Sequence, residues 1–210
     1  EDKLLVEKIK KGFENNEFKM YLQFIVDNKT KKIVSAEALS RWENPNKGLV
    51  SPNKYIGNLE SAGLISKHDF YMFELVCRQL EKWSKTKYSN ISISCNFTRL
   101  TLSEESFIDK IKKISQSYNF DKSRLSIEIT EDAIEKDREI ATKNVMLCKE
   151  LGVKTVIAKC SDDMQGKIFT KVGADKVVIP EREGGVRLAK NILSSGFVDV
   201  MELSDEVSLI

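Results

Sequence analysis

Short apolar runs typical of β-strands alternate along this chain with longer segments whose apolar residues recur at helical spacing. Strands that alternate with helices build a parallel sheet covered by helices, so the pattern predicts an α/β protein with a (β/α)8-barrel-like sheet. The segment 198–210 alternates in polarity and could add one or two strands. The expected strands are residues 21–27, 33–39, 91–96, 125–129, 155–158 and 176–179. The expected helices are residues of about 3–16, 52–62, 66–83, 104–118, 137–151, 162–172 and 183–193.

Oxygen-bearing side chains lie within or at the ends of three of these strands. Glu37 lies in the second strand-like run, Asn96 ends the third, and Glu128 lies in the fourth. The carboxyl ends of parallel strands meet at one face of a barrel, so we expect these three side chains to converge there. Two carboxylates and an amide are ligands that suit a hard cation. The sequence therefore predicts a candidate cation site on this face.

The charge balance argues against partners that a strong electrostatic field would attract. Thirty-four basic and 32 acidic residues leave a net charge of +2 in 210 residues, so we expect no nucleic acid polymer as partner. No apolar run approaches the ~20 residues that a membrane-spanning helix needs, so we expect no membrane insertion. Cys77, Cys95, Cys148 and Cys160 lack metal-binding spacing, which favours reduced, buried thiols in a cytoplasmic protein. A histidine-dependent site would have to use His68, the only histidine.

Several ordered motifs in the first two-thirds of the chain point to one family. They are Gln23-Phe-Ile-Val-Asp27, Glu37-Ala-Leu-Ser-Arg-Trp42, the segment 48–65, Asn96 and Glu128-Ile-Thr-Glu131. With these motifs, residues of about 5–150 resemble an EAL domain, the cyclic di-GMP phosphodiesterase family. Phe24 departs from this pattern, because the family has a proline after the glutamine.

The resemblance implies a role for each matching residue. Glu37, Asn96 and Glu128 would bind Mg²⁺ or Mn²⁺, which favour carboxylate and amide oxygens. Glu37 would thereby be catalytic, and Glu131 would act with it by supporting the metal site. The residues that would contact cyclic di-GMP are Gln23, Leu39 and Arg41, with Arg41 as a phosphate partner. The implied reaction is metal-assisted attack of water on one phosphodiester bond.

The end of the fifth strand departs from the EAL pattern. Active EAL domains place two aspartates there, as metal ligand and base, whereas this chain has Lys159 and Cys160. An ammonium would repel a divalent cation, and a thiol is a poor ligand for Mg²⁺. Asp162 and Asp163 follow shortly afterwards and are doubtful substitutes. They fit better as the first residues of a helix, where the helix dipole favours acidic side chains.

The last third of the chain resembles a different family. The segments Glu150–Lys159, Ser161–Lys167, Val172–Arg182 and Glu202–Leu209 are similar to the second half of an RCK domain, a Rossmann-like module that regulates potassium transport. We interpret the chain as a constructed or recombined chimera with two parts. Residues 1–145 would form an EAL-type half barrel, and residues 146–210 an RCK-type βα segment packed into the same sheet. The resulting barrel could remain incompletely closed, because such barrels usually need ~250 residues.

Three functional hypotheses follow from this interpretation. The first is a degenerate, inactive EAL-type module that keeps part of a metal and dinucleotide half-site. The second is a weakly active metal-dependent cyclic di-GMP phosphodiesterase that uses Asp162 or Asp163. The third is an oligomeric regulatory module of the RCK type. A homodimer formed through the open sheet edge or the C-terminal tail is compatible with the first and third hypotheses.

Overall fold

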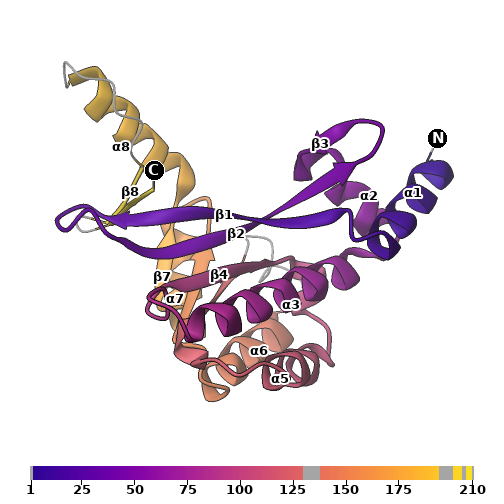
Figure 1. Ribbon diagram of the computed structural model, residues 1–210. Coiled ribbons are helices and arrows are strands. Elements are labelled where there is room, and N and C mark those ends of the chain that lie inside the picture. The colour runs from indigo at the N-terminus through magenta and orange to yellow at the C-terminus, as the bar shows by residue number, and fades with distance from the viewer. Residues whose placement is uncertain (1, 130–137, 194–200, 205–206, 210) are drawn as a thin grey trace.

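A single mixed sheet forms the centre of the molecule (Figure 1). The computed structural model describes residues 2–129, 138–193, 201–204 and 207–209, and in this part of the chain the sheet has nine strands. Their order is β7-β6-β5-β4-β2-β1-β9-β8, with β3 paired to β2. The strands are β1 (Phe18–Asp27), β2 (Ile33–Asn44), β3 (Gly48–Val50), β4 (Ser92–Phe97), β5 (Leu125–Ile129), β6 (Thr155–Lys159), β7 (Lys176–Val178), β8 (Met201–Ser204) and β9 (Val207–Leu209).

Helices connect most of these strands, as the apolar spacing predicts. The longest is α3, which carries its buried apolar residues in one stripe. The helices are α1 (Asp2–Glu14), α2 (Ile56–Ser61), α3 (Ile65–Ser84), α4 (Arg99–Leu102), α5 (Phe107–Gln116), α6 (Arg138–Glu150), α7 (Asp163–Val172) and α8 (Pro180–Leu193). Short 3₁₀ turns cover Pro52–Lys54 and Lys122–Arg124. Among the residues from 2 to 193 that the structure describes, no helix is long and apolar enough to cross a membrane.

The prediction of a parallel sheet is confirmed for β2, β4, β5, β6 and β7, which are parallel neighbours. It is wrong for β1, which pairs with β2 in antiparallel fashion. The connection from Asp27 to Ile33 is a tight turn, and a parallel crossover needs about a dozen residues or more. β2 also runs to Asn44 rather than ending at Leu39, so Glu37 lies in the middle of the strand. It nevertheless lies near the end of the stretch that pairs with β4.

The sheet does not close into a barrel within the part of the chain that the structure describes. Its path ends at β7 on one side and at β8 on the other. The strands of the tail, which the alternation at 198–210 anticipated, form a β8–β9 hairpin. β9 pairs with only three residues of β1, which are Ile25, Val26 and Asp27. The expectation of an incompletely closed barrel agrees with this arrangement.

The main core lies between one face of the sheet and the covering helices. Alternate residues of the central strands point to this face and belong to the core, among them Ala38, Ile93, Cys95, Phe97, Leu125, Ile127, Ile129, Val156 and Ala158. Side chains of α3, α5, α6 and α7 complete the cluster. The four cysteines are buried, as expected, and burial raises the pKa of the Cys77 and Cys148 thiols to about 12.

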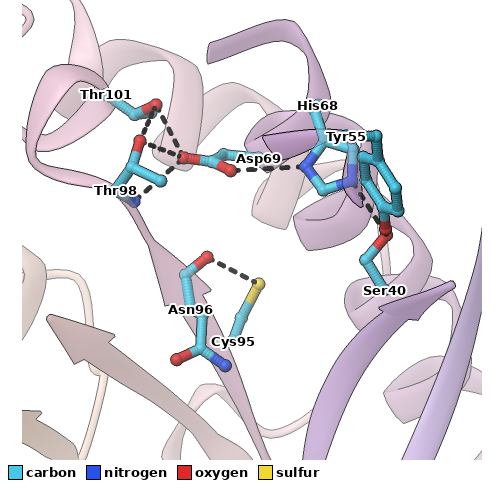
Figure 2. Close-up of polar contacts among 8 residues, drawn as sticks. All are labelled: Ser40, Tyr55, His68, Asp69, Cys95, Asn96, Thr98 and Thr101. Carbon is cyan, nitrogen blue, oxygen red and sulfur yellow. Dashed lines mark hydrogen bonds and ion pairs between the residues drawn. The ribbon is translucent and has the colours of Figure 1, made fainter. Parts of the chain in front are cut away.

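A buried carboxylate links α3 to the end of β4. Oδ2 of Asp69 accepts hydrogen bonds from the backbone N–H of Thr98 (3.0 Å), from Thr98 Oγ1 (2.8 Å) and from Thr101 Oγ1 (2.7 Å), as Figure 2 shows. Because Thr98 follows directly after β4, these bonds fix the position at which the strand ends. Asn96, one of the candidate site residues, lies two positions earlier.

The same network continues from Asp69 to β2. The Tyr55 hydroxyl donates to Ser40 Oγ at 2.7 Å, and Ser40 Oγ lies 2.8 Å from His68 Nε2 (Figure 2). His68 Nδ1 lies 3.5 Å from Asp69 Oδ1. This pattern is satisfied when Ser40 donates to Nε2 and the imidazole carries its proton on Nδ1. The network therefore joins the strand that carries Glu37 to the strand that carries Asn96.

Replacing Gly166 with alanine tests the packing of α7 on β7. A Cβ at Gly166 would lie 2.9 Å from Cγ1 of Val177, so we expect Gly166→Ala to lower the free energy of unfolding by about 1–3 kcal/mol. Gly184 on α8 is the matched control, because a Cβ there would have no atom within 4 Å. Gly184→Ala should raise stability by up to ~1 kcal/mol through helix propensity. Urea unfolding measures the free energy of unfolding of both variants. Equal changes at the two sites would contradict the close packing of α7 on β7.

Removing the Asp69 carboxylate tests the buried network. Asp69→Ala leaves three donors, two on half-buried Thr98 and one on buried Thr101, without their acceptor, so we expect a loss of about 2–4 kcal/mol in the free energy of unfolding. Asp162 is a suitable control, because its carboxylate also accepts two backbone hydrogen bonds but is exposed. Asp162→Ala should cost only about 1 kcal/mol. If the two variants unfold at the same urea concentration, the buried network does not stabilise the fold as described.

Candidate functional site

The face of the sheet opposite the main core is polar. Residues two positions apart on a strand share a face, and the pairing of Asn96 with Glu128, and of Glu128 with Ile157, places their side chains on the same side. Lys159 follows Ile157 by two positions and also points to this side. The polar residues that the register places here are Gln23, Glu37, Ser94, Asn96, Ser126, Glu128, Thr155, Lys159 and Lys176. A parallel strand with two apolar faces is the usual pattern, so this polar row marks a site.

The Lys159 ammonium lies at the centre of the three predicted cation ligands. Its Nζ is 2.9 Å from Glu37 Oε1, 2.7 Å from Glu128 Oε2 and 3.4 Å from Asn96 Oδ1. Asn96 Nδ2 also donates to Glu37 Oε1 at 2.9 Å. The structure thus brings Glu37, Asn96 and Glu128 together as expected, on three adjacent parallel strands. It adds a fourth member, from the next strand, that carries a positive charge.

Burial strengthens the electrostatics of this cluster. The side chain of Glu128 is 5% exposed and that of Glu37 is 13% exposed, whereas that of Lys159 is 32% exposed. Burial by itself lowers the pKa of Lys159, but the carboxylates of Glu128 and Glu37 outweigh it and hold this pKa above its ordinary value. The lysine therefore stays charged. Among described buried atoms, Glu128 Oε2 lacks hydrogen-bond geometry to any partner, so its contact with Lys159 is an ion pair.

The residues present do not fit a divalent metal ion. Glu37, Asn96 and Glu128 have the oxygen atoms that Mg²⁺ and Mn²⁺ favour. However, the space between these oxygens holds the ammonium, and a second cation there would be repelled at short range. Within residues 2–129 and 138–193, no group of three or more His, Cys, Asp or Glu side chains is arranged to hold a metal. The expected metal ligation is thus replaced by an internal ion-pair cluster.

A groove runs beside this cluster along β1 and β2. It encloses about 550 Å³, and its lining includes the three residues expected to contact the dinucleotide, Gln23, Leu39 and Arg41. Tyr21 and Phe24 also line this groove with exposed rings, but from opposite faces of β1. Gln23 pairs with Glu37 across the two strands, which places the groove directly next to the ion-pair cluster. Gln23, Leu39 and Arg41 were predicted from the sequence, and their contact with a dinucleotide stays a prediction. Tyr21 was not singled out, although its spacing of two positions from Gln23 places it on the same face of β1.

The residues weighed as substitutes for the missing aspartates lie elsewhere. Asp162 is the N-cap of α7 and accepts hydrogen bonds from the N–H groups of Met164 and Gln165. Asp163 forms an exposed ion pair with Arg182 at 2.6 Å. Cys160 is fully buried on the core side of the sheet, facing away from Lys159. Glu131, which was expected to support the metal site, lies outside the described residues.

His68, Asp69 and Ser40 show the order of a Ser-His-Asp triad, which spacing in the sequence did not reveal. His68 and Asp69 are 3% and 5% exposed, and the imidazole lies at 5.5–6.3 Å from the rings of Phe13, Phe18 and Tyr55. Ser40 Oγ, which would be the nucleophile, contacts both the Tyr55 hydroxyl and His68 Nε2, and the imidazole is enclosed by aromatic rings. We therefore interpret it as a structural network that positions β2 and β4.

Comparisons with known proteins agree on the larger part of the chain. Cyclic di-GMP phosphodiesterase PdeR of Escherichia coli (strain K12) is 27% identical over 146 residues, which cover 70% of this chain and 22% of that protein. The chain thus spans less than a quarter of the length of that relative. Among solved structures, the EAL enzyme Bd1971 with cAMP and cyclic di-GMP bound superimposes with a TM-score of 0.79 at 22% identity, over 92% of this chain and 55% of that one.

A second similarity is shorter. Ktr system potassium uptake protein C of Bacillus subtilis (strain 168) is 40% identical over 78 residues, which cover 37% of this chain and 35% of that protein.

The family model for the EAL domain matches residues 6–174. This match over most of its length shows that the chain belongs to the EAL domain family.

Proposed function

We propose that this chain is an EAL-type module that binds cyclic di-GMP beside β1 and β2 without hydrolysing it. The observation that carries the proposal is the contrast between the two halves of the site. The groove lined by Gln23, Leu39 and Arg41 is present, whereas Lys159 takes the position of the catalytic cation. The relatives named as cyclic di-GMP phosphodiesterases support the choice of ligand.

The groove has the chemistry that a cyclic dinucleotide requires. Arg41 lies on the groove wall, and a guanidinium forms strong, charge-assisted hydrogen bonds with phosphate oxygens. Its Nη1 already donates to the Ser40 carbonyl at 2.7 Å, which fixes the direction of the side chain. The exposed ring of Tyr21, on the same face of β1 as Gln23, offers a surface on which a purine base stacks.

The other half of the site lacks what hydrolysis needs. Water attacks a phosphodiester near neutral pH when a metal ion lowers its pKa and a base accepts its proton. Lys159 is an ammonium without a free electron pair, held by Glu37 and Glu128, and it cannot perform either task. Asp162 and Asp163 are engaged by the backbone of α7 and by Arg182. Binding and turnover are therefore separated in this chain.

We further infer that the segment from about residue 146 derives from an RCK-like sequence joined to the EAL part within α6. The similarity to Ktr system potassium uptake protein C supports this inference. The EAL match extends to residue 174, so the first part of the segment fits both patterns. β6 and β7 continue the parallel sheet, which explains how two α/β sequences could share one core.

Titration with cyclic di-GMP in EDTA tests the proposed binding. We expect calorimetry to show binding to the unaltered protein and a roughly 10- to 100-fold weaker affinity for Arg41→Ala, because one charge-assisted contact is lost. Arg78→Ala is the matched control, since Arg78 is exposed on α3 and pairs with Glu74. Chromatography with Mg²⁺ or Mn²⁺ should show no linear dinucleotide. If the unaltered protein forms the linear dinucleotide and Asp162→Ala or Asp163→Ala does not, the chain is instead a weakly active phosphodiesterase.

Solution mass tests whether a second copy completes the sheet. In the described residues, β9 leaves most of β1 uncovered and the sheet path ends at β7, so unpaired strand edges are available. We propose that a homodimer forms there, and light scattering at tens of micromolar should give twice the mass of the chain. A monomer that stays soluble over that range contradicts this proposal and leaves the binding proposal standing.

A further inference from the structure

We propose that Lys159 acts as a tethered cation that permanently fills the cation position of this site. Removal of its ammonium would convert Glu37, Asn96 and Glu128 into a binding site for a free divalent ion such as Mn²⁺. The proposal concerns the ion alone and does not rest on dinucleotide binding. The two can therefore fail independently.

The geometry around Nζ is that of an occupied ligand cage. Oxygens from β2, β4 and β5 surround the ammonium at 2.9, 3.4 and 2.7 Å: Glu37 Oε1 and Asn96 Oδ1 accept hydrogen bonds from Nζ, and Glu128 Oε2 forms an ion pair with it. Because the lysine is covalently attached to β6, its charge is present at a high effective concentration. A dissolved ion has to displace it before it can reach the oxygens.

The charges explain why the cage would accept an ion once it is empty. Two carboxylates face one ammonium, so the loss of Lys159 leaves two negative groups close together, with Glu128 only 5% exposed. Removing one partner of a buried ion pair is costly, because the remaining charge stays without compensation. A divalent cation would restore the balance with shorter contacts than those to nitrogen, since Mg²⁺–oxygen distances are ~2.0–2.1 Å. Water molecules would complete its coordination.

Lys176 provides the matched control. It starts β7, pairs with Ile157 in the register, and shares the polar face with Lys159. Burial lowers the pKa of Lys176, whereas the charge of the Glu128 carboxylate favours the charged form of Lys176 and acts to raise its pKa. The described contacts include no ion pair between Lys176 and the oxygens around Lys159 Nζ. Removing Lys176 therefore changes the net charge of the face by the same amount but leaves the cage filled.

Manganese binding to three variants tests the proposal. The unaltered protein, Lys159→Ala and Lys176→Ala are stripped with EDTA, dialysed and titrated with Mn²⁺. The readouts are the electron paramagnetic resonance signal of free Mn²⁺ and the thermal unfolding midpoint. We expect Lys159→Ala to bind Mn²⁺ at least about tenfold more tightly than the other two proteins, and its midpoint to rise with ion concentration. Adding Glu128→Gln to Lys159→Ala should abolish both effects.

The proposal is overturned if the unaltered protein binds Mn²⁺ as tightly as Lys159→Ala, or if Lys159→Ala binds no ion. If Lys159→Ala does not fold in EDTA, it is refolded with and without Mn²⁺, and folding that depends on the ion supports the cage. If neither condition gives folded protein, Lys159→Gln decides, because its amide can still donate a hydrogen bond to one carboxylate. Tighter Mn²⁺ binding by Lys159→Gln than by the unaltered protein supports the proposal, and equal binding overturns it.

Discussion

The ion pairs of Lys159 with Glu37 and Glu128, together with the hydrogen bonds of Asn96, connect four neighbouring strands on the polar side of the sheet. Buried carboxylates that lie this close together need a counter-charge, and in this chain the fold supplies it from its own next strand. The opposite side of the same strands is apolar and packs on the helices. The alternation of side chains along each strand thus separates a core that stabilises the sheet from a charged cluster that determines its chemistry.

The proposed function follows from the position of this cluster beside the groove of β1 and β2. Because Gln23 pairs with Glu37, a ligand in the groove would lie next to the ion-pair cluster. In a metal-dependent enzyme the cation would activate water there, whereas an ammonium can only balance charge. The buried network from Tyr55 to Thr101 fixes β2 and β4 relative to each other, so the groove and the cluster keep their geometry without a metal.

Much of this arrangement could be predicted from the sequence, because local patterns specify it. Periodicity located nearly every strand and helix, and the ends of parallel strands indicated that Glu37, Asn96 and Glu128 would meet. The antiparallel pairing of β1 with β2 was not predicted, because each strand was assumed to be followed by a helix. The tight turn before Ile33 instead joins the two strands as a hairpin. The sequence indicated one part of the role of Lys159, because its position suggested that it repels a metal ion. Its contacts with three side chains could not be predicted, since they depend on the register across four strands. The Ser40–His68–Asp69 network was equally hidden, since hydrogen bonds between distant segments leave no periodic signal.

The most direct test of the central claim is a crystal structure of the unaltered protein grown with Mn²⁺, with anomalous scattering measured to locate the ion. We expect continuous density for the Lys159 side chain, with its Nζ between the carboxylates of Glu37 and Glu128, and no anomalous peak at that place. An anomalous peak between these carboxylates, with Lys159 turned away, would contradict it.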